Sequence, residues 1–365
     1  MSSVATEPGS APAGARYGAD ALRAYAKSLL LAAAVRDDIA TDVAAVLVDG
    51  DLMGHNTHGL ALLADYLDQI TQGKMAASGE PTIVHAATVA QTWDGQRLPG
   101  PWLTLRALDT ALDMAAAHGT GTVVIRRSHH IACLAAYLKR ATDRGAMALI
   151  ECSDPSNHSV APFGAVTSVF TPNPLAAGIP TSRDPILIDV SASYTTNGLT
   201  ARLYKRGETL AHPFIQDAAG NATRDPAVLF TEPKGTLLPL GGLEAGHKGY
   251  GLALIVEALT AGLSGHGRAD PSEGWGATVF VQVLDPKAFG GTDAFNRQMD
   301  WLVDACHNAT PRPGNAAVRL PGERALALHR EQSERGVALY PSIMSSLVPW
   351  ASKAGITPPP CLPPR

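Results

Sequence analysis

Residues 120–132 are Thr120-Gly121-Thr122-Val123-Val124-Ile125-Arg126-Arg127-Ser128-His129-His130-Ile131-Ala132, and this stretch decides the fold class. Its first six residues are mostly β-branched and carry no charge, which predicts a buried strand. Residues 134–145 have apolar side chains three and four positions apart, which predicts a helix. Two adjacent histidines therefore stand where a strand passes into a helix. In layered α/β proteins such a junction is where ligands are usually held.

Imidazole titrates near neutral pH, so His129 and His130 are candidates for moving a proton. For either residue taken alone, the alternative is a histidine at a helix start that only hydrogen-bonds the backbone. A second pair, His55 and His58, lies in a turn between two predicted helices. The two pairs together favour a chemical role.

The composition is that of an ordinary globular chain with room for two lobes: 365 residues, 45% hydrophobic, 17% charged, net charge −4. Lys and Arg are scattered, so we expect no nucleic-acid partner. No apolar run approaches the ~20 residues of a membrane span. The four cysteines lie far apart without a CxxC pair, which argues against a disulfide scaffold or a thiolate zinc site and fits a reducing cytoplasm.

The pattern of elements predicts a mixed α/β fold with four segments. We expect disordered tails at residues 1–15 and, rich in proline, at 356–365. Residues 16–80 form a predicted helical lobe, joined by about 318–355. Residues 81–317 form a predicted central α/β domain. Predicted strands are 83–85, 90–93, 120–125, 146–151, 186–191 and 279–283; predicted helices are 18–35, 37–54, 60–70, 103–118, 134–145, 252–263, 293–310, 324–336 and 342–354.

The usual nucleotide signatures are absent. No GxGxxG follows a strand and no Walker loop occurs, so a Rossmann domain is disfavoured. The histidines offer imidazoles for a metal, but HExxH is missing and no carboxylate stands at ligand spacing beside either pair. We therefore predict no metal site.

Lys248 lies among Gly246, Gly249 and Gly251 before a predicted helix, where a cation could hold a phosphate or carboxylate. The alternative is a solvated lysine on a flexible loop.

Several motifs follow one another in a recognisable order. They are Asn56-Thr57-His58-Gly59, Ser128-x-His130, the block 153–155 with 161–164 and 173–174, Ile188-Asp189-Val190-Ser191, the pair 238–242 and 248–252, and Leu320-Pro321-Gly322-Glu323. Any one of them is weak. In this order they resemble the type-2 malate/L-lactate dehydrogenase family, which includes ureidoglycolate, sulfolactate and diketogulonate enzymes and cyclic-imine carboxylate reductases. The resemblance covers residues 20 to 340 approximately.

The resemblance implies an oxidoreductase that transfers a hydride between NAD or NADP and a small 2-hydroxy/2-oxo acid or cyclic 2-imino acid. It implies a non-Rossmann nicotinamide-binding sheet domain, a helical lobe made from both ends of the chain, and a homodimer with the active site near the subunit contact. His130 would accept the substrate's hydroxyl proton, or donate it in reverse. His58 would be the other acid/base histidine, and Thr57 and Asp154 would complete the catalytic set.

The resemblance also implies a set of residues that line the cofactor. They are Ser153, Asp189, Val190, Ser191, His247, Lys248, Pro321, Gly322 and Glu323.

The departures from the family pattern lie beside the two histidines, in the central block and at the position of a substrate-binding arginine. Thr57 replaces a serine and keeps its hydroxyl, Ala132 replaces a glycine, and Thr171 replaces the glycine of G-T-N-P. Many members carry an arginine shortly after S-H-G that is thought to bind the substrate carboxylate. Here those positions are Leu60-Ala61-Leu62-Leu63. We expect a different carboxylate clamp, or a less acidic and bulkier substrate.

Two other functions stay open. One is a cofactor-binding protein without turnover, against which the intact His58, His130 and Lys248 argue. The other is a metal-dependent hydrolase built on the four histidines.

Overall fold

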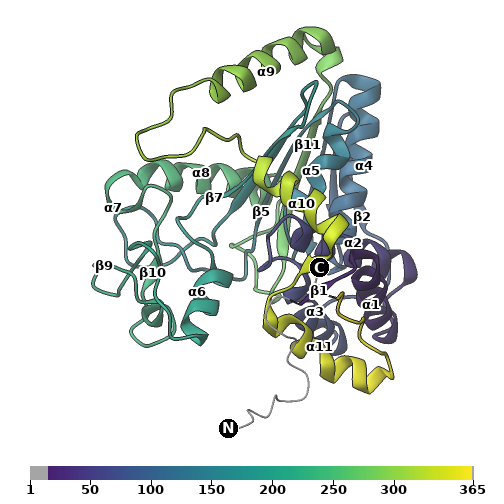
Figure 1. The fold of residues 1–365 in the computed structure, drawn as a ribbon, viewed down its shortest axis with the longest axis vertical. Coiled ribbons are helices and arrows are strands. Elements are labelled where there is room, and N and C mark those ends of the chain that lie inside the picture. Colours follow the sequence, from purple (N-terminus) through teal and green to yellow (C-terminus); the bar gives the residue numbers. More distant parts are fainter. Residues whose placement is uncertain (1–14, 364–365) are drawn as a thin grey trace.

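The computed structural model describes residues 15–363 of the chain. Of the N-terminal tail expected to be disordered, residues 1–14 lie outside the described residues. The predicted mixed α/β fold is confirmed: a central sheet is packed with helices, and a lobe of helices stands beside it (Figure 1). Within the described residues, none of the helices is both long enough and apolar enough for a membrane span.

The central sheet has seven strands in the order β2-β3-β4-β11-β5-β6-β7. Only β3 and β4 run parallel; every other neighbouring pair is antiparallel. The strands are β2 (Thr82–Ala87), β3 (Ala90–Asp94), β4 (Thr120–Ser128), β5 (Met147–Ser153), β6 (Pro174–Ile179), β7 (Ile186–Ser191) and β11 (Ala277–Leu284). β11 lies at the centre, and its β-branched residues Val279, Val281 and Val283 are fully buried.

Helices cover the sheet because its central strands are apolar on both faces. α4 (Gly100–His118) packs on β4 and β11, and α5 (Ala135–Thr142) packs on β5, β6 and β7. α8 (His247–Glu257) and the turn Ala258–Gly262 that continues it contact β5, and the turn also contacts β4 and β11. The residues that leave β4 and β5 therefore emerge between packed layers.

The lobe combines the two ends of the chain, as predicted. Purple α1 (Ala19–Ala32), α2 (Asp37–Leu52) and α3 (Leu63–Thr71) lie beside yellow α10 (Glu323–Arg335) and α11 (Pro341–Ala354) in Figure 1. β1 (Arg16–Tyr17) pairs antiparallel with β12 (Val337–Ala338). One hydrophobic core runs from these helices into the sheet, so the lobe packs directly against the sheet.

A smaller unit stands on the other side. Here α6 (Asn197–Lys205) and the short sheet of β8 (Ile215–Gln216), β9 (Ala222–Thr223) and β10 (Thr236–Leu237) enclose a second core. The sequence predicted mostly loop at 207–245, and two-residue strands of this kind lack a readable periodicity. α7 (Gly242–Ala245) precedes α8, and α9 (Thr292–His307) follows β11.

β6 was not predicted. Its sequence, Pro174 to Ile179, contains two alanines and a glycine, which have low strand propensity. Gly178 packs closely on α5, because a Cβ there would lie 3.0 Å from Thr142 Cγ2 and 3.1 Å from Leu138 Cβ. Close packing against a helix, rather than propensity, explains this strand.

The prediction of a glycine-rich loop before a helix at 252 was wrong. α8 begins at His247, and Gly249 lies within its first turn. A Cβ on Gly249 would stand 2.3 Å from the Leu240 backbone nitrogen. The glycine therefore allows the helix to pack against the preceding turn.

The proline-rich end also differs from the expected disordered tail at 356–365. Within the described part, the Leu362 N–H donates to the Arg16 carbonyl at 2.7 Å. The Leu362 side chain lies over Gly336, where a Cβ would meet it at 2.3 Å. A backbone hydrogen bond and one apolar side chain fix this segment beside β1.

Candidate functional site

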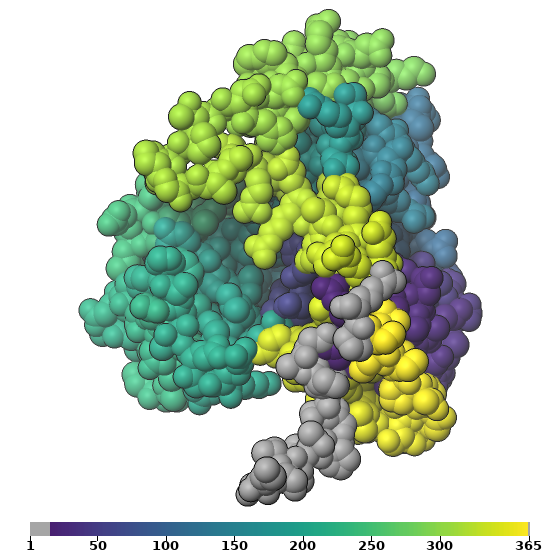
Figure 2. Space-filling view, in the orientation of Figure 1, coloured from purple at the N-terminus to yellow at the C-terminus, as the bar shows by residue number. Residues whose placement is uncertain are grey.

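A cavity of about 430 Å³ lies where the lobe, the sheet and α6 meet. Its walls come from the turn 55–62, the loop 130–134, the ends of β5 and β7, the first residues of α6, and 275–277 before and within β11. Figure 2 shows the surface recessed between the teal segments and the purple and yellow helices. A volume of this size suits a small molecule or part of a cofactor.

The structure brings together seven of the residues predicted from the sequence. The cavity-lining ones are Thr57, His58, His130, Ser153, Asp154, Asp189 and Ser191.

The two predicted acid/base histidines face each other. The rings of His58 and His130 are stacked with centroids 5.8 Å apart and planes 28° apart. Burial lowers the pKa of His58 and lowers that of His130 well below its ordinary value, the latter helped by the neighbouring His58 and His129. Both rings are therefore neutral near pH 7.

The ring nitrogens of these histidines have different partners. His130 Nδ1 accepts from the Ala132 N–H at 3.3 Å and lies 2.9 Å from the Tyr66 hydroxyl. Because a backbone N–H can only donate, the neutral His130 ring carries its proton on Nε2. His58 Nδ1 lies 2.9 Å from Thr57 Oγ1, a hydroxyl that can donate or accept. The substitution of threonine for serine keeps this bond.

His129 has a different environment from its neighbour. It is fully buried, with its ring against Trp275 at 4.9 Å and Tyr66 at 5.9 Å, and it does not line the cavity. Burial, helped by Arg97, lowers the pKa of His129 to about 3. Of the adjacent pair, His130 alone is placed for chemistry in the cavity.

Asp154 is held by its own turn. Its carboxylate accepts the Ser156 N–H at 2.9 Å and a hydrogen bond from the Asn157 amide. Burial raises the pKa of Asp154. The preceding Ser153 donates to Glu257 at 2.7 Å and accepts from Arg268 at 3.2 Å, which fixes the end of β5 against α8.

The other predicted cofactor residues do not line this cavity. Val190 points to the opposite side of β7 from Asp189, and His247 and Lys248 are exposed on the first turn of α8. The Pro321 carbonyl accepts from the Leu187 N–H, Gly322 packs on the same residue, and Glu323 bonds His307. Their cofactor role stays a prediction.

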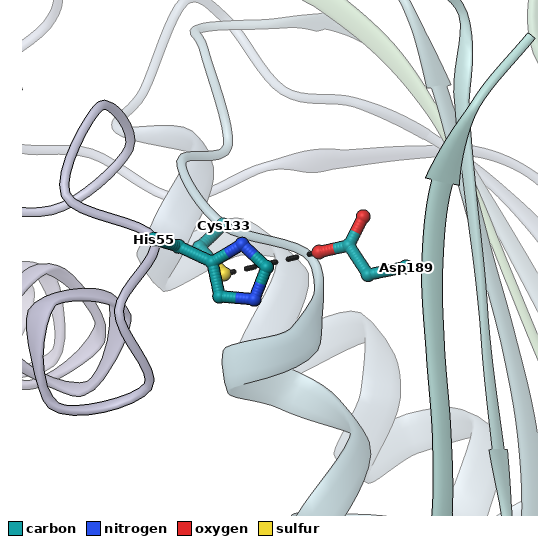
Figure 3. Close-up of side chains that lie close together, drawn as sticks. All are labelled: His55, Cys133 and Asp189. Carbon is teal, nitrogen blue, oxygen red and sulfur yellow. Dashed lines mark hydrogen bonds between the residues drawn. The ribbon is translucent and has the colours of Figure 1, made fainter. Parts of the chain in front are cut away.

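Sequence reasoning missed three residues that shape the site, Tyr66, Trp275 and Cys133, and named His55 only as a member of a histidine pair. Tyr66 is buried on α3 and bonded to His130, and Trp275 lies 4.9 Å from the His130 ring. His55 and Cys133 lie near Asp189 (Figure 3). Trp275 stands between two glycines just before a strand, a signal that could have been used. Tyr66 carries none, because a helical core position looks the same with or without a polar partner.

Within the described residues 15–363, no lysine or arginine lines the cavity, so none replaces the absent family arginine there. Leu62 lies in the cavity wall. Nearby Arg202 donates to the Asn56 side chain and carbonyl at 2.8 and 2.9 Å. The Ala132 substitution sits at φ +60°, in the left-handed region that favours glycine.

Comparisons with known proteins agree with this fold and site. The sequence model described as Malate/L-lactate dehydrogenase matches residues 17–348. The chain is 31% identical over 345 residues to an L-lactate dehydrogenase from Cupriavidus necator, covering 92% of this chain and 97% of that one. It is 31% identical over 300 residues to a (2R)-3-sulfolactate dehydrogenase (NADP(+)) from Chromohalobacter salexigens, covering 80% and 85%.

A solved structure of delta1-piperideine-2-carboxylate reductase from Pseudomonas syringae pvar. tomato has the same fold. The TM-score is 0.80 at 23% identity, over 92% of this chain and 99% of that one.

The α/β fold, the paired histidines and relatives named as dehydrogenases define the class of the protein as an oxidoreductase. The chain belongs to the malate/L-lactate dehydrogenase family.

Proposed function

We propose that the protein is an NAD(P)-dependent oxidoreductase that interconverts a 2-hydroxy acid and a 2-oxo acid, or a cyclic amino acid and its 2-imino acid. The observation that carries this proposal is the pair of stacked, neutral imidazoles, His58 and His130, on one wall of a cavity. Relatives named for lactate, sulfolactate and a cyclic imine acid support this range of substrates.

We assign the proton transfer to His58. In the neutral ring His58 Nδ1–H can donate to the Thr57 hydroxyl, which leaves Nε2 free to accept the substrate's proton, and the same hydrogen bond persists when the ring is protonated. His130 lacks this freedom, because protonating its Nδ1 would set an N–H against the Ala132 N–H. His130 then presents Nε2–H to the substrate's oxygen or imine nitrogen and orients it.

The residues around the cavity fit a nicotinamide. The polar side chains of Ser191, Thr171, Asn157 and Asn197 line it, and Pro172 and Pro174 offer apolar surface for a ring. When bound, the nicotinamide supplies the hydride acceptor or donor. Ser153, at the end of β5, would hold it against the histidines.

The substrate carboxylate must be bound without an arginine in the lining. We propose that Asn197 and the first backbone N–H groups of α6 hold it, since the first turn of this helix contributes 196–198 to the wall. Neutral donors bind a second acidic group poorly. We therefore expect a monocarboxylic substrate with an apolar side chain that packs on Leu62.

The test is cofactor-dependent turnover. NADH and NADPH oxidation should be followed against 2-oxo acids, with and without amines, and against cyclic imines. His58→Ala and His130→Ala should each lose about 10²-fold or more in turnover, whereas His85→Ala, at an exposed position on β2, should match the wild type. A silent panel with retained cofactor binding favours the binding protein without turnover. Absence of cofactor binding overturns the proposal.

The metal-dependent hydrolase has less support. His129 faces the core, so the four histidines do not converge on one ion. Cofactor-dependent turnover that survives a chelator excludes this reading.

A further inference from the structure

We propose that His55, Cys133 and Asp189 form a binding site for a zinc-like divalent ion at the edge of the cavity. The three side chains come from the turn after α2, the loop before α5, and β7, and they converge in Figure 3. An imidazole nitrogen, a thiolate and a carboxylate oxygen are the donors that Zn²⁺ prefers. This site uses neither His58 nor His130.

The three donor atoms lie near one another. One ligand atom from each residue lies within 4.8 Å of the other two. In a zinc site with bonds of about 2.0–2.3 Å, ligand atoms are about 3.3–3.8 Å apart. Rotations of the side chains that move each atom by about 1 Å would close the site.

The surroundings orient the carboxylate. The Ala135 N–H, in the first turn of α5, donates to Asp189 Oδ2 at 2.9 Å. Outer hydrogen bonds of this kind fix metal ligands in place. The Cys133 thiol can donate to the same oxygen, with Sγ 3.8 Å from Oδ2.

Charge balance favours a divalent ion. Binding replaces the Cys133 proton, which leaves to solvent, with an S–metal bond. The resulting thiolate and the Asp189 carboxylate together neutralise the two positive charges of the ion, and His55 binds as a neutral ligand. Cys133 is buried, so this neutralisation is what makes a thiolate tolerable there.

All three residues also line the cavity. Three protein ligands leave the fourth position of the ion open, and here it faces the cavity, as in zinc sites that bind water or an anionic group. Of the residues in the described range 15–363, this is the group of three whose donor atoms converge.

The test uses Co²⁺ as a coloured probe and Zn²⁺ as a competitor. The chelator-treated full-length protein should bind one Co²⁺ per chain with a thiolate charge-transfer band, and Zn²⁺ but not Mg²⁺ should abolish the band. Cys133→Ala should remove the band. His55→Val should weaken Zn²⁺ binding at least about tenfold, since even outer partners have effects of this size.

Two variants serve as controls. Cys306→Ala and His85→Ala change a cysteine and a histidine outside the cluster and should bind like the wild type. If Cys133→Ala fails to fold, proton release decides: the wild type should release about one proton per Zn²⁺ at neutral pH. An unchanged band in Cys133→Ala, no band in the wild type, or no proton release overturns the proposal.

Discussion

Tyr66 is a buried core residue whose hydroxyl contacts His130, one of the two candidate catalytic histidines. The Tyr66 hydroxyl lies 2.9 Å from His130 Nδ1 and 3.1 Å from the His130 carbonyl, and its one O–H can donate to either acceptor. Burial raises the pKa of Tyr66 well above its ordinary value, so the phenol stays protonated. It holds the ring without exchanging a proton.

We expect Tyr66→Phe to reduce turnover about tenfold, because the ring keeps its packing but loses its tether to His130. The loss of one hydrogen bond should cost about 1 kcal/mol of unfolding free energy. Tyr25→Phe is the matched control, since the buried Tyr25 hydroxyl lacks a partner within 15–363. Equal turnover in the two variants would refute the tether.

The depressed histidine pKa values predict a pH profile. Neutral imidazole accepts the proton during oxidation, and the pKa of His58 and that of His130 lie below the ordinary 6.5. We therefore expect kcat/KM for oxidation of a hydroxy acid to be level around pH 7 and to fall only on the acidic side of 6.5. A profile that falls from about pH 7 or above, near the ordinary pKa of histidine, would contradict this reading.

Leu62 tests the origin of substrate preference. Leu62→Arg places a cation in the lining, and we expect kcat/KM for small or dicarboxylic 2-oxo acids to rise about tenfold, the size of one charged hydrogen bond. Ala61→Arg adds the same charge at a position that does not line the cavity. A rise in both variants would mean long-range attraction rather than a clamp.

At this scale the sequence predicted seven cavity residues, because their motifs fall at strand ends and turns. It assigned no role to Cys133 or Trp275, and it named His55 only as a member of a histidine pair. Their proximity depends on how the lobe packs against the sheet, and no local pattern encodes that packing.

The turn that follows α2 holds a buried carboxylate. Asp51 Oδ2 accepts the Leu60 N–H at 2.7 Å, and a Cβ on Gly59 would stand within 2.5 Å of this carboxylate. Burial raises the pKa of Asp51 to about 7. The turn that carries His55 and His58 is therefore hydrogen-bonded to Asp51, whose neutral form is favoured by burial.

This element should lose stability as the pH rises. The folded state keeps the Asp51 proton up to pH 7 or so, whereas the unfolded chain loses it near its ordinary pKa of 3.8. The contribution of Asp51 to the free energy of unfolding should fall through this range by up to about 4 kcal/mol, since each pKa unit is worth 1.36 kcal/mol. The lowered pKa values of His58, His129 and His130 act in the opposite direction. Urea titrations at mildly acidic and mildly alkaline pH measure this free energy of unfolding.

Asp51→Asn should remove this contribution, and Asp113→Asn, at an exposed position on α4, should keep it. The same change of stability with pH in the wild type and in Asp51→Asn would refute the assignment.

Elements with clear periodicity were predicted well. β4, α4 and α2 carry their pattern in their own residues. β6 and the start of α8 do not, because their small residues are chosen for close contact with α5 and with the turn at Leu240. Tertiary packing overrides local propensity at both places.

The whole molecule leaves large apolar side chains exposed. On α8 and the turn after it, Leu254, Ile255 and Leu263 are 46%, 53% and 56% exposed. Such residues on one helical segment are typical of a subunit interface. They are the surface on which we expect the predicted homodimer to form.

Light scattering should give twice the chain mass for the wild type and one chain mass for the double variant Leu254→Asp with Ile255→Asp. Ile83→Asp, on the edge strand β2, also replaces an exposed apolar residue and should stay dimeric. A monomeric wild type, or a dimer unaffected by the double variant, would refute this interface.

The pairing of β1 with β12 joins residues 320 positions apart, and Leu362 is fixed beside the same strand. During synthesis on the ribosome, the first three helices therefore emerge long before α10 and α11 exist to cover them. The apolar faces of these helices stay uncovered until α10 and α11 have left the exit tunnel. The lobe that carries His58 is the last part of the protein to close, so a truncated nascent chain should never assemble the site.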